Sequence, residues 1–515
     1  MLGAELLVRS LAAGGIELCI GNPGTSEMHI IAALDRTPGL RGVLALFEGV
    51  ATGAADGYAR MKGRPAATLM HLGPGLANGL CNLHNARKAR MPIVNIVGEH
   101  AAHHRRYDAP LHSDVEGAAR PFSDWLRTAQ SAATLSADCA AAIAAARMPP
   151  GRIATLILPA DTAWTDGGVA IAPSLAAVAP ARVHSARIES AARRLALGAR
   201  VGLMIGGPCL GERGIALAHG IAAATGCRVF TQMSNARIER GVGRLPVKRV
   251  PFPVDEAVSF LAGLDTVLML AAKPPVAFFA YPDKPSLLTP AGCALVALAE
   301  PEEDALAALE DLAAAVSARA ATAAEPVLLD APSAGPLGAG VLAAIIAHQL
   351  PQNAIVIDEA LSLGFTLYPA MENAAAHDWL QMAGGATGEG LPLAVGAALA
   401  CPDRKVVCLQ GDGSALYTCQ ALWTMAREGL NVTSIILSNR SYASLFAELS
   451  KVGANGAGPA ALGMIRFDDP AIGWPDIARG FGVPGERAVD AAQLSAALAR
   501  ALATPGPSLI EAVLA

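Results

Sequence analysis

Short apolar runs separated by segments of helical length recur along the whole chain. Each run ends at a glycine or a polar residue, as expected of buried parallel strands whose sheet is covered by helices on both faces. The runs that we interpret as strands are 18–20, 43–47, 67–70, 93–97, 155–158, 201–205, 228–231, 266–270, 406–409, 432–437 and 508–513. The pattern predicts an α/β fold of parallel sheets.

These elements fall into three groups, and a chain of 515 residues is long enough for several domains. We expect domains at 1–165, 181–320 and 334–515, each a doubly wound parallel sheet. Residues 159–180 are rich in Pro, Gly, Ala and Asp, which predicts a linker between the first two domains.

Composition restricts the compartment and the partners. The chain is 53% hydrophobic with a mean hydropathy of +0.40, but alanine raises both values and no apolar run is long enough to span a membrane. The first residues lack the basic region of a secretory signal. Nine scattered cysteines without a CxxC pair indicate free thiols. We therefore expect a cytoplasmic protein. The net charge of −5 gives no reason to expect a nucleic-acid or membrane partner.

The most informative stretch surrounds Gly411-Asp412-Gly413. These residues follow the apolar run 406–409 and precede an expected helix at 414–428, and the next apolar run ends at Ser438-Asn439. A right-handed β-α-β crossover would bring Asp412 and Asn439 together at the carboxyl ends of neighbouring strands. Their oxygens, with a backbone carbonyl near Ser441, suit Mg²⁺, which takes few protein ligands and uses phosphate oxygens for the rest.

A helix that starts near Ser414 would also direct its first N–H groups toward those phosphates. A Gly-Asp-Gly sequence alone fits an ordinary turn equally well. Asn439, at the end of the next strand, is what favours the metal site.

Glu48 is a second candidate, because it follows an apolar strand and has few polar neighbours in Leu46-Phe47-Glu48-Gly49-Val50. A poorly solvated carboxylate favours a shared proton or a neutral acid. A glutamate that simply faces water at the end of a strand fits this segment equally well.

Several motifs together resemble the thiamine-diphosphate enzymes. The Gly-Asp-Gly sequence followed by Asn439 is similar to their diphosphate motif, although Ser438 replaces the first of two asparagines. The pyrimidine-binding domain of these enzymes is similar to three segments of the first domain, 21–24, 47–48 and 53–60. Their cofactor-binding loop is similar to Gly384-Gly385, Gly388 and 391–392. Their order along the chain is that of the superfamily of acetolactate synthase, pyruvate oxidase and benzoylformate decarboxylase.

The resemblance implies roles for individual residues. Glu48 would bond the pyrimidine ring nitrogen and favour the imino form that removes the C2 proton, and the carbonyl of Gly385 would accept a hydrogen bond from the 4′-amino group. The implied catalytic residues are Glu48, His71, Thr25 and Ser26; the implied cofactor contacts are Gly385, Ser362, Gly411, Gly413, Ser414 and Tyr442; and the implied Mg²⁺ ligands are Asp412, Asn439 and Ser441.

The resemblance also implies a 2-oxo acid substrate, decarboxylation or carboligation, and a homodimer as the minimum active unit, with a homotetramer as the common assembly. His71 matches an active-site histidine of benzoylformate decarboxylase, although a histidine packed in a loop is the alternative. Thr25 matches its active-site serine, with Ser26 as a neighbouring hydroxyl. No histidine occurs near 278–281, where the second is expected, and His112 and His377 are possible substitutes.

Other departures affect the cofactors and leave the reaction open. The stretch 271–275 lacks the flavin-contacting Arg-Phe-Asp-Asp of acetolactate synthase, so we do not expect FAD. Thr387 replaces a bulky residue that wedges the cofactor into its folded shape, and 443–467 is expected as a loop or short helix over the substrate. Neither the 2-oxo acid nor the choice between decarboxylation and carboligation follows from the sequence, and a non-catalytic cofactor-binding protein remains the alternative.

Overall fold

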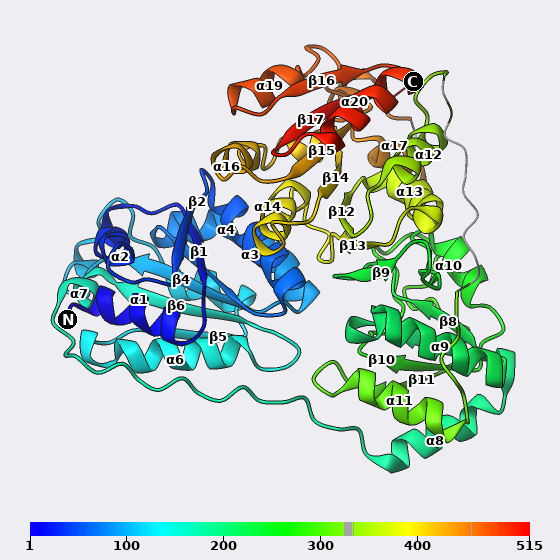
Figure 1. Ribbon diagram of the computed structural model, residues 1–515, viewed down its shortest axis with the longest axis horizontal. Helices are drawn as coiled ribbons and strands as arrows, with labels where there is room; N and C mark the ends of the chain where they lie inside the picture. Colours follow the sequence, from blue (N-terminus) through cyan, green and yellow to red (C-terminus); the bar gives the residue numbers. More distant parts are fainter. Residues whose placement is uncertain (324–331, 333, 455, 515) are drawn as a thin grey trace.

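The computed structural model describes residues 1–323, 332, 334–454 and 456–514. Three sheets organise the chain, each covered by helices (Figure 1). The α/β class with three parallel sheets, predicted from the apolar runs, is confirmed. None of the helices in the described residues is both long and apolar enough to cross a membrane.

The N-terminal sheet has six parallel strands in the order β2-β1-β3-β4-β6-β5. The strands are β1 Leu18–Gly21, β2 Arg41–Leu44, β3 Ala66–Met70, β4 Ile93–Glu99, β5 Trp125–Thr128 and β6 Ile153–Pro159. The helices are α1 Gly3–Ala13, α2 Met28–Leu34, α3 Glu48–Lys62, α4 Leu72–Ala89, α5 Val115–Ala119, α6 Leu135–Ala146 and α7 Ala160–Trp164. Strand β5 was not expected, because it is a partly exposed edge strand without a continuous apolar run.

The second sheet has four parallel strands in the order β11-β10-β7-β8. These are β7 Val201–Ile205, β8 Arg228–Thr231, β10 Thr266–Leu270 and β11 Ala294–Ala299. The surrounding helices are α8 Ser185–Leu195, α9 Glu212–Thr225, α10 Val254–Leu261 and α11 Ala305–Ala315. Strands β7 and β10 are fully buried, as their apolar runs predicted.

The third sheet has seven strands in the order β16-β17-β15-β14-β12-β13-β9. They are β9 Ile238–Arg240, β12 Ala354–Glu359, β13 His377–Gln381, β14 Val406–Gly411, β15 Val432–Ser438, β16 Gly485–Ala488 and β17 Ser508–Val513. The main helices are α12 Ala339–Gln349, α13 Gly364–Ala370, α14 Gly390–Ala400, α17 Ala443–Lys451, α18 Pro459–Gly463, α19 Trp474–Gly480 and α20 Ala491–Ala503.

Strand β9 comes from the stretch assigned to the middle domain, yet it pairs antiparallel with β13. The third sheet is therefore parallel except at this edge. The domain boundaries themselves stay a prediction, because one strand of the middle stretch contributes to the last sheet.

Two expected elements were wrong in detail. The helix expected at 414–428 is divided into α15 Asp412–Ala415 and α16 Ala421–Arg427. In the interruption, the backbone N–H of Thr418 bonds the carbonyl of Ala415 three residues back, and the Thr418 hydroxyl donates to the carbonyl of the distant Gly388 at 3.0 Å. The strand expected at 43–47 ends at Leu44, and Glu48 begins α3 instead of ending a strand.

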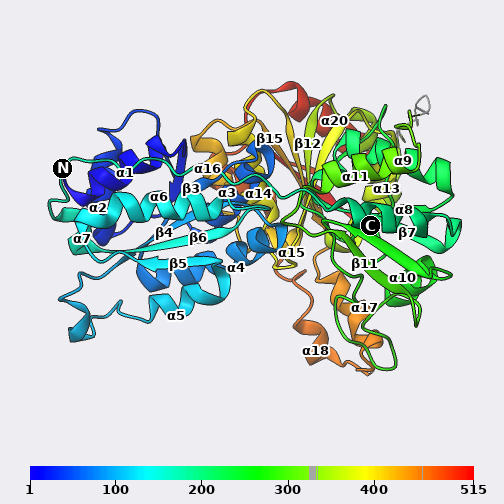
Figure 2. The same ribbon diagram turned by 90° about the horizontal axis from the view of Figure 1, so that it is seen from below.

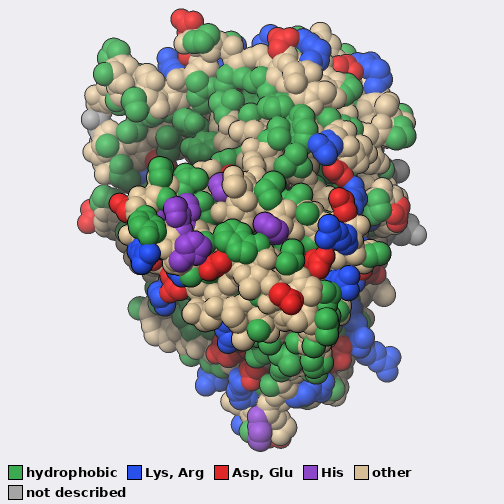
Figure 3. All heavy atoms as spheres, turned by 90° about the vertical axis from the view of Figure 1, so that its left-hand side faces the viewer, with side chains coloured by type: hydrophobic (Ala, Val, Ile, Leu, Met, Phe, Trp, Pro, Cys, Tyr) green, Lys and Arg blue, Asp and Glu red, His purple; other side chains and the backbone are tan. Residues whose placement is uncertain are grey.

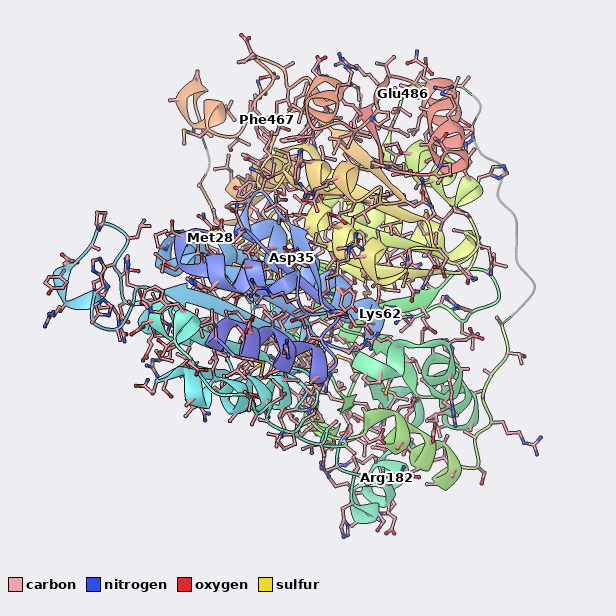
Figure 4. All side chains as sticks on the ribbon, turned by 60° about the vertical axis from the view of Figure 1, so that its left-hand side comes forward. Met28, Asp35, Lys62, Arg182, Phe467 and Glu486 are labelled. Atoms are coloured by element: carbon pink, nitrogen blue, oxygen red, sulfur yellow. The ribbon has the colours of Figure 1, made fainter. Side chains whose placement is uncertain are left out.

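Helix α3 packs tightly along α14 and joins the first and third domains (Figure 2). A Cβ at Gly57 would lie 2.2 Å from the carbonyl oxygen of Leu393, and one at Gly396 would lie 1.9 Å from that of Ala54. Glycine is required on both helices at this close approach, which explains the small-residue sequence of α3. Lys62, at the end of α3, lies where the three regions meet (Figure 4).

Candidate active site

A pocket lies at the carboxyl end of the seven-stranded sheet, beside β12, β14 and β15, and contains about 350 Å³ of empty space, including space open to solvent. Open parallel sheets bind ligands at this edge. The pocket brings together eight of the residues singled out in the sequence: Ser362, Gly411, Asp412, Gly413, Ser414, Asn439, Ser441 and Tyr442. Strands β14 and β15 are neighbours, as the β-α-β interpretation required.

Asp412 is the buried acid of this pocket. Its carboxylate accepts the backbone N–H groups of Gly413 at 2.9 Å and of Arg440 at 2.6 Å. Burial raises the pKa of Asp412 above its usual value, against the opposing effect of these hydrogen bonds. A buried carboxylate whose partners are backbone N–H groups retains lone pairs that a cation can use.

The donor set fits a hard divalent cation that shares its coordination with phosphate. Asn439 Oδ1 is turned toward Ser441, whose N–H donates to it at 3.0 Å. No group of three or more His, Cys, Asp or Glu side chains in the described part of the chain could hold a metal by itself. One carboxylate, one amide oxygen and a backbone carbonyl form the sparse set that Mg²⁺ accepts when phosphate oxygens complete its shell.

The glycine of the loop is a steric requirement. A Cβ at Gly413 would lie 2.5 Å from Cε1 of Tyr442 and 3.0 Å from Cζ of Phe467. The two aromatic rings pack edge to face, with centroids 5.1 Å apart. Phe467, marked in Figure 4, therefore closes one side of the loop on which Asp412 sits.

A second group of polar residues lies at the carboxyl edge of the six-stranded sheet, around Glu48. Glu48 is 8% exposed, and its carboxylate accepts a hydrogen bond from Asn78 at 3.0 Å. A Cβ at Gly75 would lie 2.8 Å from Glu48 Oε1 and 3.3 Å from the Cβ of His71. Glu48 and His71 are therefore neighbours, and Glu48 is enclosed rather than facing water.

His71 lies at the end of β3 and is held by a carboxylate that the sequence did not single out. Its Nδ1 bonds Glu27 Oε2 at 2.7 Å, and the N–H of Gly24 donates to the same oxygen at 2.7 Å. Burial raises the pKa of Glu27, and Gly24 and His71 oppose that shift. Glu27 thus fixes the orientation of the His71 ring.

The hydroxyls predicted to bind substrate lie beside this pair. Thr25 and Ser26 belong to the short 3₁₀ segment Thr25–Glu27, which ends at the glutamate that holds His71. A Cβ at Gly24 would lie 2.3 Å from Cε1 of His71, so the loop backbone lies directly against the imidazole. The four implied catalytic residues are therefore carried by neighbouring elements.

Gly385 lies in a loop that two other elements hold. Asn85, on α4, donates its Nδ2 to the carbonyl of Ala386 at 2.8 Å and accepts that residue's N–H at 3.1 Å. Glu359, at the end of β12, accepts the N–H groups of Gly388 at 2.7 Å and Gly390 at 2.5 Å. The loop of the third domain is thus fixed from the first domain and from its own sheet.

Phe278 lies in the segment 278–281, where the resemblance to benzoylformate decarboxylase implied a second histidine. A Cβ at Gly385, whose φ is +79°, would lie 2.5 Å from Cζ of Phe278. This ring packs against Phe252 and Phe279, and Phe252 also packs against Phe365. The neighbourhood of Gly385 is therefore aromatic at this point.

The two proposed substitutes for that histidine differ in placement. His377 lies inside β13 and is 1% exposed, and burial together with Arg240 lowers its pKa to about 3. It lies in the interior of the third sheet, so His377 is wrong as a substitute. His112 lies in the loop after β4, with its ring centroid 6.3 Å from that of His100.

Within one chain, the Glu48 group and the Asp412 pocket belong to different sheets. No hydrogen bond joins Glu48 to Asp412 or Asn439 in the described residues. The residues that sequence reasoning missed are Glu27, Asn85 and Glu359. Glu359 carries the same signal as Glu48, a carboxylate directly after an apolar run, whereas Asn85 carries no local signal.

The comparisons with known proteins agree with this geometry. Residues 1–119 match the N-terminal TPP binding domain of thiamine pyrophosphate enzymes, and residues 364–512 match the C-terminal TPP binding domain. The chain is 47% identical to a Mycobacterium tuberculosis protein named "Putative acetolactate synthase large subunit IlvX", over 100% of this chain and 99% of that protein. It is 30% identical to benzoylformate decarboxylase of Pseudomonas aeruginosa, over 96% of each chain.

Among solved structures, the thiamine diphosphate-dependent 4-hydroxybenzoylformate decarboxylase of Rhodococcus jostii RHA1 superposes with a TM-score of 0.86 and 25% identity. The match covers 100% of this chain and 99% of that one. The two family matches lie on the two sheets whose carboxyl edges carry the Glu48 group and the Asp412 pocket. The chain belongs to the thiamine pyrophosphate enzyme family.

Proposed function

We propose that the protein uses thiamine diphosphate and Mg²⁺ to decarboxylate a 2-oxo acid, with carboligation as a second outcome. The observation that carries the proposal is the enclosed Glu48 beside His71 and Asn78. A carboxyl buried at this point is an acid–base group next to a histidine, which a mere binding scaffold does not need. The identities to benzoylformate decarboxylase and the acetolactate synthase relative support the reaction class.

The residues would divide the work as follows. Asp412, Asn439 and the carbonyl of Ser441 would hold Mg²⁺ and thereby the diphosphate, and Ser362, Gly411, Gly413, Ser414 and Tyr442 would line it. The carbonyl of Gly385 would accept a hydrogen bond from the pyrimidine amino group. When bound, the cofactor supplies the carbon nucleophile and the electron sink for decarboxylation.

At the other edge, Glu48 would hold the pyrimidine nitrogen by a hydrogen bond. His71, oriented by Glu27, would donate or accept a proton at the carbonyl oxygen of the substrate. Thr25 and Ser26 would bind the substrate carboxylate through their hydroxyls.

Two copies of the chain would complete the site. Exposed apolar side chains lie near both groups: Leu46 is 41% exposed just before Glu48, and Leu416 and Tyr417 are 38% and 53% exposed just after α15. Burial of such residues between subunits would bring the Glu48 group of one chain to the Asp412 pocket of another. We propose a homodimer as the minimum active unit and a homotetramer as the assembly.

The surroundings of Gly385 favour a substrate with an apolar side chain. Phe278 and Phe365 are 44% and 49% exposed, and Leu445 on α17 is 45% exposed. Tyr281, in the same segment as Phe278, donates its hydroxyl to Glu448 on α17 at 2.8 Å. The segment 443–467 is therefore helical in part and tied to the middle domain, where it would cover an apolar group.

The test is a panel of 2-oxo acids with aromatic, branched and linear side chains, incubated with the protein, thiamine diphosphate and Mg²⁺. Release of carbon dioxide and formation of carbon–carbon bonds are followed together. We expect carbon dioxide from at least one apolar acid, with colourless protein and no requirement for FAD. No turnover of any acid, together with C2-proton exchange as slow as in free cofactor, would leave the non-catalytic binding protein as the explanation.

A further inference from the structure

Histidine side chains gather at the end of β4, beyond the residues that the family motifs cover. His100 follows β4 directly, and its ring centroid lies 5.4 Å from that of His104 and 6.3 Å from that of His112. Histidines are seen together on the face of the N-terminal domain in Figure 3. His100 is thus the centre of a group whose outer members are His104 and His112.

This histidine group adjoins His71. Strands β3 and β4 pair in parallel with Met70 opposite Val97, so the residues that follow them leave the same sheet edge. A Cβ at Gly73 would lie 1.8 Å from the hydroxyl oxygen of Ser113, so the loop that carries His112 lies on the turn after His71. The pKa of His100 is lowered overall, and burial is the main cause. Glu99 raises it, whereas His104, His112 and His71 lower it further.

Two buried ring nitrogens of the histidine group are available to carry a proton. His100 Nε2 and His112 Nδ1 are buried and bond no other described atom. A histidine that only packs a loop normally uses such nitrogens in hydrogen bonds. No group of three or more His, Cys, Asp or Glu side chains that could hold a metal occurs in the described part of the chain.

The proposed reaction requires proton delivery. Decarboxylation breaks the bond between the carbonyl carbon and the carboxylate and leaves that electron pair on the carbonyl carbon. A proton must then bond to this carbon, so one 2-oxo acid and one proton give one aldehyde and one carbon dioxide. The donor that supplies the proton must be refilled from solvent in every turnover.

We propose that His104, His100 and His112 form a relay that carries this proton from solvent to the reacting centre at His71. The proposal rests on the proposed decarboxylation and adds to it the residues that supply its proton. His104 is exposed, His100 and His112 are partly buried, and the His71 side chain is 25% exposed, so the group runs from solvent inward. The centroids of neighbouring rings lie 5.4 and 6.3 Å apart, and no hydrogen bond among the described residues joins them, so the proton would pass through an intervening water molecule.

The charged and polar neighbours suit such a relay. Glu99, Arg105, Asp114 and Glu116 line a cavity with His112. Glu99 bonds the N–H of His100 at 2.6 Å, and Tyr107 packs against the His104 ring with centroids 5.9 Å apart. These side chains place both acidic and basic groups beside the histidines.

The experiment compares His100→Gln and His104→Gln with His103→Gln as the matched control. His103 is exposed in the same loop, and no ring contact of the described residues involves it. Because His104 is exposed, its replacement does not endanger folding. For each variant kcat is measured at saturating substrate, with and without added imidazole, together with cofactor binding and C2-proton exchange.

We expect His100→Gln to lower kcat by about 10²-fold and His104→Gln by about 10-fold, within the range for lost proton transfer. Cofactor binding and C2-proton exchange stay at the wild-type level, imidazole restores much of kcat, and His103→Gln behaves as wild type. The relay is overturned if kcat of His100→Gln stays within about twofold of wild type. It is also overturned if imidazole does not restore the lost kcat and the variant binds the cofactor more weakly. Absence of carbon dioxide from the wild type instead removes the proposed function, and the relay with it.

Discussion

The carboxyl edges of the six-stranded and seven-stranded sheets are built in different ways. At the seven-stranded edge, Asp412 and Asn439 are bonded by backbone N–H groups of the loops that follow β14 and β15, and Arg440 reaches Asp412 from 28 residues away. At the six-stranded edge, His71 is bonded by a side chain 44 residues away, and Glu48 by one 30 residues away. One edge is an oxygen cradle, a set of side-chain oxygens oriented by backbone N–H groups, and the other is a set of acid–base groups oriented by side chains.

This difference indicates a division of labour. An oxygen cradle holds a cation and phosphate but moves no proton, whereas the side chains around Glu48 and His71 can exchange protons. If the division is real, damage at one edge should spare the function of the other. The following variants test it, beginning with the largest effect.

Glu48→Gln should remove the chemistry and spare cofactor binding. Gln has the shape of Glu but cannot serve as an acid, and the diphosphate is held at the other sheet. C2-proton exchange of bound cofactor, followed by NMR, should slow by about 10²–10⁴-fold, while cofactor affinity stays close to wild type. Glu256→Gln, an exposed residue of α10, is the control. Equal exchange in wild type and Glu48→Gln would exclude Glu48 as the activating acid.

Asp412→Ala should give the opposite result. The wild type should gain about 2.7 kcal/mol of stability at cofactor concentrations near 100 times Kd, and this gain should need Mg²⁺. Without the carboxylate the gain should vanish, as measured by thermal melting with and without cofactor and Mg²⁺. Asp403→Ala, an exposed aspartate of the same domain, should keep it. A melting shift that survives in Asp412→Ala would place the metal elsewhere.

Glu389→Gln tests the contact between the two domains. Arg60 of α3 bonds Glu389 at 2.5 Å and Asp56 at 2.7 Å, and all three side chains are fully buried. Burial raises the pKa of Glu389 well above its usual 4.5; Arg60 opposes this shift, and Asp56 and Glu359 add to it. The folded state therefore holds this proton more tightly than the unfolded state, and stability is lost as the pH rises from the unfolded pKa toward the folded one.

We expect the melting temperature of the wild type to fall as the pH rises above 4.5, the usual pKa of glutamate, and to fall less in Glu389→Gln. Gln keeps a hydrogen-bonding oxygen for Arg60 but does not titrate. Glu256→Gln serves again as the exposed control. Parallel melting profiles for wild type and Glu389→Gln would show that this carboxyl does not link the domains to pH.

The sequence by itself determined the fold class and the oxygen cradle. Buried parallel strands are continuous apolar runs, so β7, β10, β14 and β15 were visible as patterns. Asp412 and Asn439 were found because each directly follows such a strand, and adjacent parallel strands place their ends together. The order of residues along the chain was therefore sufficient to predict that Asp412 and Asn439 lie close together.

Tertiary structure alone decided what depends on contacts between distant segments. The helix expected at 414–428 is interrupted where Thr418 bonds the distant Gly388, and β9 joins the third sheet because it pairs with β13. Glu27 was missed because its partner His71 follows β3 and lies 44 residues away along the chain. Helix propensity and apolar periodicity describe a segment in isolation, whereas these hydrogen bonds exist only after the chain has folded.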